Sequence, residues 1–470
     1  MTSNEIIKLI EAQAGQVTSK IITDIIADQA TEKTRMMRLY NAYDQVSTAV
    51  PILSRTFEDG NKINEKLAHD FRGDIVDTVV GYLWGKPVTY GIRADNYPEA
   101  TLNKINQEIE LFKLRNNLED LDSHTGKMMT ICGKAARLLY VDKNGEIRVM
   151  NINPWEAIFI KDATLNQTQY AMIYYSVTTV IDGQSKILTR VEWYDKQNVS
   201  FWISSEGGAF IPDTIMTENG NTTIPHMFDF IPLIEYVNND SNKGDFEKVE
   251  GLIDAYDILE SDVQNELEEL RLAYMIFSGG AEADSETILK ARQTGAFSMP
   301  EGTSVSFLTK SLSDTIIENH KKTIAENIYK FSKSVDMSDE KFSGQGQSGE
   351  SRKWKLVGLE NKCISKERKF VKASREMFQV LCSAWNKKQI PLVYTDVQIT
   401  LNRNLPVELS YLKDVVTGLT GLVPKKILLG LLPFIPNVET ALALLEEEQG
   451  MGFSFANNNT QTQTTDGETE

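Results

Sequence analysis

The feature that most constrains the fold is a long run with a helical period, GDFEKVEGLIDAYDILESDVQNELEELRLAY at 244–274. Its apolar residues recur in steps of three and four, the spacing of one helix face; they are Leu252, Tyr256, Leu259, Val263, Leu267, Leu270 and Tyr274. Ten residues of this run are acidic, and only Lys248 and Arg271 are basic. The run therefore predicts a long amphipathic helix with a strongly negative surface, and we expect Gly279 and Gly280 to end it.

The first part of the chain has the composition of helices. Residues 1–48 are expected to be helical. Within 61–92, an apolar series begins at Leu67 after Asn64, which is a candidate N-cap, and Pro87 ends this helix. VTYGI has the composition of a short strand, and 103–136 predicts one or two further helices.

The period changes at about residue 137. Short runs rich in Val, Ile, Tyr and Trp, such as YAMIYYSVTTV and ILTRVEWYD, are separated by polar turns such as DKNG at 142–145. This pattern predicts a β-rich module that reaches about residue 237. After the long helix, SVSFL at 304–308 has strand composition, and a second helix is expected at about 312–336.

A basic helix is expected after the second helix. Eleven Lys or Arg residues lie between 350 and 388 against four acidic residues, and we expect Trp354 and Trp385 to be core residues of this helix. VQITLNRNLP at 397–406 predicts a strand, and small helices follow it. The last residues, NNNTQTQTTDGETE, have the low complexity that is typical of disorder.

Composition excludes several classes of protein. The chain of 470 residues is 41% hydrophobic and 24% charged, which is typical of a globular protein, and no run is long and apolar enough for a membrane span. The N-terminus does not resemble a secretory signal, so an intracellular protein is expected. Three separated cysteines and four scattered histidines predict neither a disulfide framework nor a zinc site. A net charge of −17 argues against tight binding of nucleic acid.

One motif raises the possibility of a nucleotide site. GQGQSG at 344–349 matches the G-x-G-x-x-G fingerprint of dinucleotide-binding folds. That fingerprint requires a strand before the first glycine and a helix at the last. The preceding residues are helical and then polar, and the region about twenty residues further on is a basic helix, so the context fails. We interpret the stretch as a flexible connector between two helices and expect no cofactor.

The order of these parts resembles the portal proteins of long-tailed phages of Gram-positive bacteria. Four segments carry the resemblance: NEKLAHDFRGDIVDTVVGYLWGKPVTY (64–90), INPWEAIFI (152–160), VEGLIDAYDILESDVQNELEEL (249–270) and ITLNRNLPVELSYL (399–412). The resemblance covers nearly the whole chain. It implies an α+β subunit of a ring, twelve-fold in the virion, at the capsid vertex where double-stranded DNA enters and leaves.

The resemblance also implies a division of the chain. The regions are 1–240 and 351–404 as the wing, 241–274 and 312–336 as two stem helices around a tunnel, 275–311 as the clip, 337–350 as a tunnel loop, 405–450 as the crown and 451–470 as a disordered tail. The implied partners are further copies of the chain, DNA read without sequence preference, the terminase large subunit, the major capsid and scaffolding proteins and a head-completion adaptor. No membrane and no catalysis are implied, and assembly takes place in the host cytoplasm.

Three sets of site residues follow from this division. The loop that faces DNA comprises Lys341, Phe342, Ser343, Gly344, Gln345, Gly346, Gln347, Ser348 and Gly349. The acidic tunnel lining comprises Glu260, Glu266, Glu268 and Glu269. The clip surface that faces the terminase and the connector comprises Glu282, Asp284, Glu286, Lys290 and Arg292.

The charges suit a conduit better than a clamp. Carboxylates that line a tunnel repel phosphate over a Debye length of about 8–10 Å, whereas a basic lining would hold DNA tightly. An ordinary solvated helix face stays open as an alternative. The basic helix could contact packaged DNA or, as we favour, the acidic surface of a neighbouring subunit; its cations are Arg352, Lys353, Lys355, Lys362, Lys366, Arg368, Lys369, Lys372 and Arg375. A non-portal capsid or adaptor scaffold and a nucleotide-dependent enzyme are the alternative functions.

Overall fold

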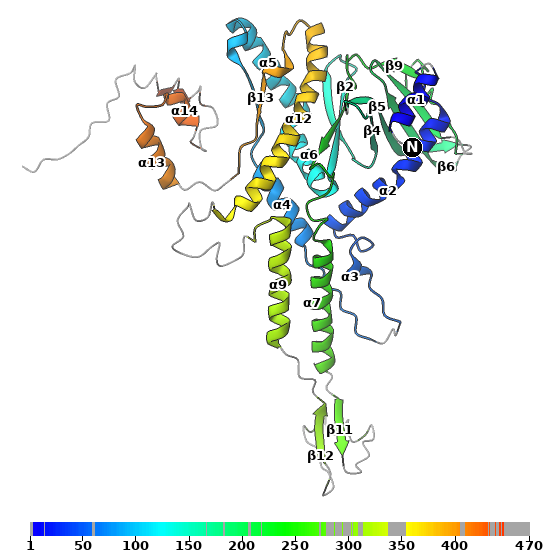
Figure 1. The fold of residues 1–470 in the computed structure, drawn as a ribbon, viewed down its shortest axis with the longest axis vertical. Helices are drawn as coiled ribbons and strands as arrows, with labels where there is room; N and C mark the ends of the chain where they lie inside the picture. The colour runs from blue at the N-terminus through cyan, green and yellow to red at the C-terminus, as the bar shows by residue number, and fades with distance from the viewer. Residues whose placement is uncertain are drawn as a thin grey trace, which may run out of the picture. The chain divides into compact units, whose positions relative to one another are not determined.

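The fold of the chain comes from a computed structural model. It describes residues 3–13, 15–58, 62–165, 167–181, 184–204, 208–217, 219–271, 274–278, 286, 294, 302, 304–308, 314–336, 354–404, 409–430, 432, 438, 441–442 and 444–445. The chain forms two compact units, Met1–Asn404 and Leu405–Glu470. Helices and sheets are mixed in the larger unit (Figure 1), which confirms the predicted α+β class.

The helices begin where a side chain can satisfy free backbone amides. Thr18 accepts from Ile21 N (3.4 Å) at the start of α2, and Asp70 accepts from Gly73 N (2.9 Å) at the start of α4. The helices of the larger unit are α1 (Ser3–Ala12), α2 (Ser19–Tyr43), α3 (Pro51–Ser54), α4 (Phe71–Trp84), the 3₁₀ turn η1 (Ala94–Asn96), α5 (Glu99–Asn116), α6 (Leu118–Cys132), α7 (Glu250–Arg271), α9 (Asp314–Ser332), α12 (Val357–Lys387) and the 3₁₀ turn η2 (Tyr394–Asp396).

Within the described residues, the strands form four antiparallel sheets. Strands β4, β5, β6, β7 and β8 make a six-stranded sheet with β9, which pairs with β7; β10, β2 and β3 make a three-stranded sheet; β1 pairs with β13, and β11 with β12. Their bounds are β1 (Thr89–Ile92), β2 (Lys134–Val141), β3 (Ile147–Ile152), β4 (Ala157–Lys161), β5 (Thr168–Ile181), β6 (Gln184–Tyr194), β7 (Asn198–Ser204), β8 (Phe210–Pro212), β9 (Thr223–Pro225), β10 (Leu233–Val237), β11 (Tyr274–Ser278), β12 (Ser304–Leu308) and β13 (Val397–Thr400). The predicted β-rich module is thereby confirmed.

The six-stranded sheet is covered on both faces. Helices α1 and α2 lie on one face, where Ile10 and Ile22 pack with Met172 and Trp193. Side chains of the opposite face pack against the three-stranded sheet through residues such as Leu233. The alternation of side chains along each strand sends apolar groups to both cores, which explains the near-continuous apolar runs of this module.

Several sequence predictions were confirmed and others were wrong. Helices α5 and α6, strand β12 and the α7 and α9 helices lie where they were expected. Helix α7 is shorter than predicted, since it ends at Arg271 and Tyr274 belongs to β11, so Gly279 does not end it. Asn64 does not cap a helix; residues 62–70 are non-helical, and Asp70 is the cap. Trp385 is buried, but Trp354 is 77% exposed and is no core residue.

In the described part of the smaller unit, two helices flank an isolated bridge between Thr420 and Val423. It contains α13 (Leu409–Leu419) and α14 (Lys425–Gly430), which confirms two of the small helices predicted in this region. Leu428 is its buried side chain within α14.

Candidate functional site: the helix pair α7 and α9 and its anchorage

Helices α7 and α9 lie side by side (Figure 1). Ile253 and Tyr256 of α7 and Ile324 and Ile328 of α9 are buried, and the rings of His69 and Phe71 pack against Tyr256 with centroids 4.9 and 5.0 Å away. Glu260 of α7 also pairs with Lys321 of α9 at 2.8 Å. The chain between the two helices includes β11 and β12, which pair in antiparallel register from Tyr274↔Leu308 to Ser278↔Ser304.

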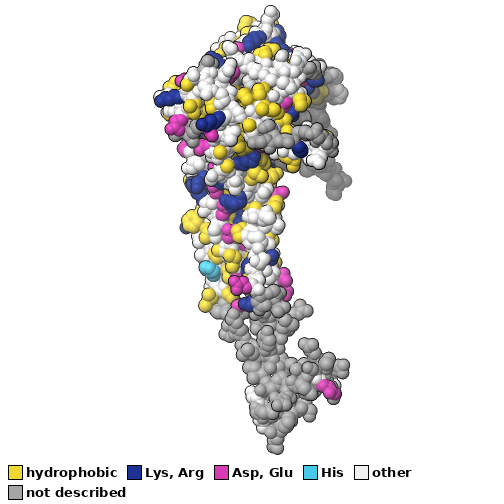
Figure 2. All heavy atoms as spheres, turned by 90° about the vertical axis from the view of Figure 1, so that its right-hand side faces the viewer, with side chains coloured by type: hydrophobic (Ala, Val, Ile, Leu, Met, Phe, Trp, Pro, Cys, Tyr) yellow, Lys and Arg dark blue, Asp and Glu magenta, His cyan; other side chains and the backbone are white. Residues whose placement is uncertain are grey.

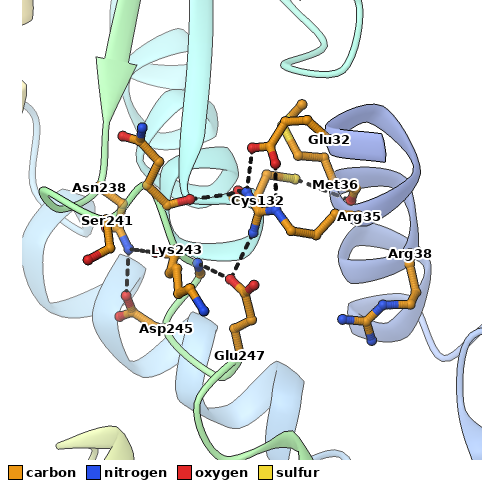
Figure 3. Close-up of polar contacts among 12 residues, drawn as sticks. Glu32, Arg35, Met36, Arg38, Cys132, Asn238, Ser241, Lys243, Asp245 and Glu247 are labelled. Carbon is orange, nitrogen blue, oxygen red and sulfur yellow. Dashed lines mark hydrogen bonds and ion pairs between the residues drawn. The ribbon is translucent and has the colours of Figure 1, made fainter. Parts of the chain in front are cut away.

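The chain just before α7 is held by an arginine of α2 (Figure 3). Arg35 donates to the carboxylates of Glu32 (2.7 Å) and Glu247 (2.8 Å), and to the carbonyl oxygens of Cys132 (3.2 Å) and Asn242 (3.1 Å). The planar guanidinium thus joins α2, the end of α6 and the loop that leads into α7.

Two lysines of α12 hold the same loop from another side. Lys366 and Lys362 lie 3.0 and 3.2 Å from Asp245 Oδ2, and Asn238 donates to the other oxygen of that carboxylate at 2.8 Å. Lys366, only 2% exposed, also donates to Thr130 Oγ1 at 2.9 Å. Burial opposes charge on Asp245, but the two ammonium groups overcome it and lower its pKa to about 2. Burial also lowers the pKa of Lys366.

The ion pairs continue along α7. Arg38 contacts both oxygens of Glu250 (2.7 and 2.9 Å), Arg72 pairs with Asp254, and Arg55 lies 2.7 Å from Asp262. The buried Asp257 accepts from His69 twice, from the backbone N at 2.9 Å and at Nδ1 at 3.0 Å.

Most of the negative charge of this region is therefore balanced inside the subunit. Of the ten acidic residues at 244–274, six pair with Lys or Arg and Asp257 pairs with His69; the six are Asp245, Glu247, Glu250, Asp254, Glu260 and Asp262. The cations come from α2, the residue after α3, α4, α9 and α12. The acidic residues of α7 thus act first as anchors, a role that the sequence analysis missed.

Two glycines allow the loop before α7 to lie against the end of α6. A Cβ on Gly244 would lie 2.1 Å from the carbonyl oxygen of Ile131. A Cβ on Gly133, whose φ is +82°, would lie 2.0 Å from the carbonyl oxygen of Asn242. Both distances are far inside van der Waals contact, so only glycine fits at either position.

The structure describes only four of the predicted site residues with their side chains, namely Glu260, Glu266, Glu268 and Glu286. Glu260 is paired, and Glu266 and Glu268 are partly exposed near the end of α7. Glu286 is exposed. The remaining predicted site residues lie outside the described residues or have side chains outside them; they are Glu269, the loop 341–349, Glu282, Asp284, Lys290 and Arg292.

Part of the basic helix α12 has partners within its own chain. Lys362, Lys366 and Lys369 pair with Asp245 and Asp240, and a contact of this helix with a neighbouring subunit stays a prediction. The basic composition of this helix does not indicate which acidic residues of the chain the fold places beside its lysines. Three further cations stay exposed, namely Arg368, Lys372 and Arg375; Arg352 and Lys353 lie outside the described residues.

The described residues contain no group of three or more His, Cys, Asp or Glu side chains placed to hold a metal ion. Within the same residues, no helix combines the length and the apolar character that a membrane crossing needs.

Comparison with known proteins decides the family. Residues 20–452 match the family described as phage portal protein, SPP1 Gp6-like. The chain belongs to this family of phage portal proteins. A portal protein of Bacillus phage SPP1 is 23% identical over 83% of this chain and 77% of its own length, and a portal protein of Clostridium phage phiCD119 is 26% identical over 91% and 95%.

Membership of the portal family confirms the function predicted from the resemblance. The protein is a phage portal protein, a virion component that serves the packaging of DNA at the capsid vertex. The alternatives of a non-portal scaffold and a nucleotide-dependent enzyme receive no support from the comparison.

Proposed function

We propose that twelve copies of the chain form a ring in the virion, with α7 and α9 as the wall of a tunnel for double-stranded DNA. The pairing of α7 with α9, together with the anchorage of α7 by cations from five parts of the chain, carries this proposal. A tunnel wall has to stay in shape while a duplex moves past it. Buried ion pairs and close backbone contacts resist such deformation.

The regions of the ring follow from the order of the chain. Residues 1–240 and 351–404 form the wing, which contacts the major capsid and scaffolding proteins, and 405–450 forms the crown. The clip at 275–311, with Glu282, Asp284, Glu286, Lys290 and Arg292 on its surface, docks the terminase large subunit and later the head-completion adaptor. The subunit needs no cofactor and no catalysis of its own for this role.

The tunnel wall repels DNA weakly rather than binding it. Because Lys321 balances Glu260, we assign the repulsion mainly to Glu268 and Glu269, with Glu266 beside them. Carboxylates within a Debye length of about 8–10 Å of the duplex disfavour phosphate contacts, so the DNA slides. The loop 341–349 projects toward the DNA and gives way to it, since its glycines permit many backbone conformations.

Two experiments test this function. Negative-stain microscopy of the purified protein is expected to show rings with a central hole, and a stable monomer at high concentration contradicts the proposal. The double substitution Glu268→Gln and Glu269→Gln is expected to slow packaging or ejection severalfold while rings still form. Glu110→Gln, on exposed α5, is the matched control with normal kinetics. Unchanged kinetics in the double variant would remove the assigned repulsion.

A further inference from the structure

The hairpin of β5 and β6 is longer than the strands on either side of it. Among the described strands, β4 pairs with β5 only as far as Ile173, and β7 pairs with β6 only from Arg190 onward. The rest of the hairpin, up to the pair of Ile181 and Gln184, is joined only by the pairing of β5 with β6. On the side of β4, the edge of β5 after Tyr174 therefore has no neighbour among the described strands. We name this part of β5, residues 176–181, the free edge.

The backbone of the free edge presents unpaired hydrogen-bonding groups. Tyr174 N donates to the carbonyl oxygen of Glu156 at 2.9 Å, on the side of β4. Successive residues of a strand direct their backbone groups to opposite sides, so Ser176, Thr178 and Val180 direct theirs to the same side as Tyr174. No described strand pairs with them there. Such a row of donors and acceptors is a template for one more strand.

The sequence of the free edge lacks the features that usually protect the edges of sheets. The run YSVTTVI, from Tyr175 to Ile181, contains no charged residue and no proline, and its last five residues are β-branched. The outer edge of β6 differs, since it carries Lys186 and since Thr189 N donates to Ser204 Oγ at 2.8 Å. Of the two edges of the hairpin, the edge of β5 is therefore the one more open to a further strand.

The same part of the hairpin exposes two large apolar side chains. Val180 is 71% exposed and Ile187 is 75% exposed. Ile187 lies opposite Thr178 in the register, so both side chains lie on the face that carries Tyr174 and that α2 covers further along the sheet. Figure 2 looks onto the side of the larger unit at which β6 lies in Figure 1, and hydrophobic side chains are visible there. Exposed apolar groups beside an unpaired edge indicate an interaction surface.

A pocket of about 440 Å³ lies between α2 and the sheet at the beginning of the free edge. Large apolar side chains line it: Ile26, Met37, Trp155, Tyr174 and Phe210. The two charged residues of its lining, Lys33 and Glu156, have opposite signs, so the pocket suits an uncharged side chain. Ser176, with which the free edge begins, belongs to the same lining. A strand that pairs with the free edge can therefore place one large side chain in the pocket.

We propose that the free edge binds an extended segment of another virion protein, which adds one strand to the sheet. The segment runs antiparallel to β5, as β4 and β6 do. Its C-terminal end then lies beside Ser176, where a large uncharged residue enters the pocket. The inference rests on the proposed contact of the wing with the capsid and scaffolding proteins. It deepens that proposal by naming the surface and the kind of segment that the surface accepts.

Symmetry argues against a second copy of the chain as the occupant. Pairing of two identical edges needs a two-fold axis between the copies, whereas neighbours in the proposed ring are related by rotation about the ring axis. Pairing with the other edge of the hairpin in a second copy would bring Lys186 against an uncharged strand. Because the free edge carries no charge, we expect uncharged, β-branched residues in the segment that binds it.

Binding of a synthetic peptide to the purified protein tests strand addition. The probe is the fluorescein-labelled peptide Val-Thr-Val-Thr-Val-Thr-Trp, N-methylated at its Thr residues, whose amides face away from β5, so that it does not associate with itself. The control peptide is N-methylated at its Val residues instead. Fluorescence anisotropy is expected to show binding of the probe and roughly tenfold weaker binding of the control, because the methylated amides cannot donate to the free edge. Equal binding of the two peptides overturns the inference.

A proline in the free edge tests the same contact from the side of the protein. Thr178→Pro removes an amide that points away from β6, so the hairpin keeps its own hydrogen bonds. Thr178→Ala keeps this amide and is the matched control. The proline variant is expected to bind the probe roughly tenfold more weakly than the alanine variant, while its Tm and its ring assembly match those of the wild type. Equal affinities of the two variants contradict strand addition.

A substitution in α2 tests the pocket. Ala30 is exposed and lines the pocket, whereas Ala27 is exposed and does not line it. Ala30→Trp fills the pocket and is expected to weaken binding of the probe severalfold, but not binding of a probe that ends in Ala. Ala27→Trp is the control with unchanged affinity for both probes. If the two Trp variants bind the probe equally well, the assignment of the anchor residue is wrong.

The portal content of assembled heads tests the source of the segment. Heads made with Thr178→Pro are expected to contain severalfold less portal protein than heads made with Thr178→Ala, measured by quantitative immunoblot. Normal portal content overturns the capsid partner, and loss of ring assembly in Thr178→Pro overturns the inference in favour of a second copy. A wild-type protein that forms no ring overturns the proposed function, and the peptide measurement on the subunit then still decides whether the free edge accepts a strand.

Discussion

At the scale of single residues, the contact of Lys366 with Asp245 is expected to be highly sensitive to substitution. Both side chains are almost fully buried, at 2% and 4% exposure. Removal of one partner of a buried pair leaves an uncompensated charge and costs about 3–5 kcal/mol. Asp245→Asn is therefore expected to lower the free energy of unfolding by about 3 kcal/mol in urea titrations of the subunit.

Asp240→Asn provides the matched control for this prediction. Asp240 pairs with Lys369 on the same helix but is 90% exposed, and exposed pairs contribute little. Its loss is expected to change the free energy of unfolding by less than about 0.5 kcal/mol. Equal effects of the two substitutions would contradict the assignment of Asp245 as a buried anchor.

Acid gives a second measure of the same carboxylate. The pKa of Asp245 is lowered from 3.8 in the unfolded chain to about 2 in the folded chain. A lowered pKa means that the contribution is fully present above pH 3.8 and is lost as the pH falls through 2. The difference between wild type and Asp245→Asn is thus expected to shrink by about 2 kcal/mol between pH 5 and pH 2. A constant difference would place the pKa of Asp245 at its ordinary value.

The loop before α7 depends on a glycine as well as on charge. Gly244→Ala brings Cβ to 2.1 Å from the carbonyl oxygen of Ile131, so backbone has to move. Such overpacking is expected to cost about 3 kcal/mol, measured by thermal unfolding. Gly358→Ala in α12 is the control, because nothing lies within 4 Å of a Cβ there; it is expected to be neutral or slightly stabilising. A loss of stability equal to that of Gly244→Ala would contradict the close approach.

At the scale of secondary-structure elements, Arg35 joins two helices and the loop that leads into α7. Its four acceptors lie on α2, on the end of α6 and on the loop before α7. Arg35→Lys keeps the charge but loses the planar fork, and we expect a loss of about 2 kcal/mol together with faster proteolysis between 238 and 250. Arg38→Lys, on a side chain that is 45% exposed, is expected to cost at most about 1 kcal/mol. Equal proteolysis of both variants would argue against an anchor at Arg35.

The sequence predicted where the helices lie, but not the contacts that hold their ends in place. The period of α7 is local, so its existence follows from 244–274 alone. The residue at which α7 begins does not follow from this stretch. The helix begins only at Glu250, because Gly244 lies against Ile131 and Asp245 pairs with Lys366, and both partners are far away in the chain. Likewise, the helix predicted from Asn64 does not begin there, because residues 62–70 are non-helical. Backbone amides of this segment donate to side chains of α7, for example that of Glu65 to Asn265 Oδ1. Hydrogen bonds between such distant segments leave no periodic signal.

The charges of the site were visible in the sequence, but their partners were not. A run of ten acidic residues suggested an open negative surface, since local charge patterns show no partner. Arg35 lies 212 positions from Glu247, and Arg55 lies 207 positions from Asp262. Only the fold brings these residues together. The net charge of the chain is −17. Since the carboxylates at the start of α7 are paired, other acidic residues of the chain carry most of this negative charge.

At the scale of the whole molecule, the loop 337–350 connects two elements that are already fastened to each other. Lys362 of α12 donates to the carbonyl oxygen of Ser332 at the end of α9 (2.8 Å). This contact does not involve the loop. The fastening of α9 to α12 at this point therefore does not depend on the loop.

Deletion of 342–349 tests whether the loop serves DNA transport or the fold of the subunit. We expect rings to assemble normally, because α9 and α12 stay joined through Lys362, and the Tm of the subunit to change by no more than a few degrees. DNA packaging or retention is expected to fail, measured as protected genome per phage particle. A variant of equal length, with GQGQSG at 344–349 replaced by GSGSGS, is the matched control: packaging is retained if backbone flexibility is what matters. Normal phage yield from the deletion would show that the loop has no part in DNA transport, and loss of rings would assign it to assembly instead.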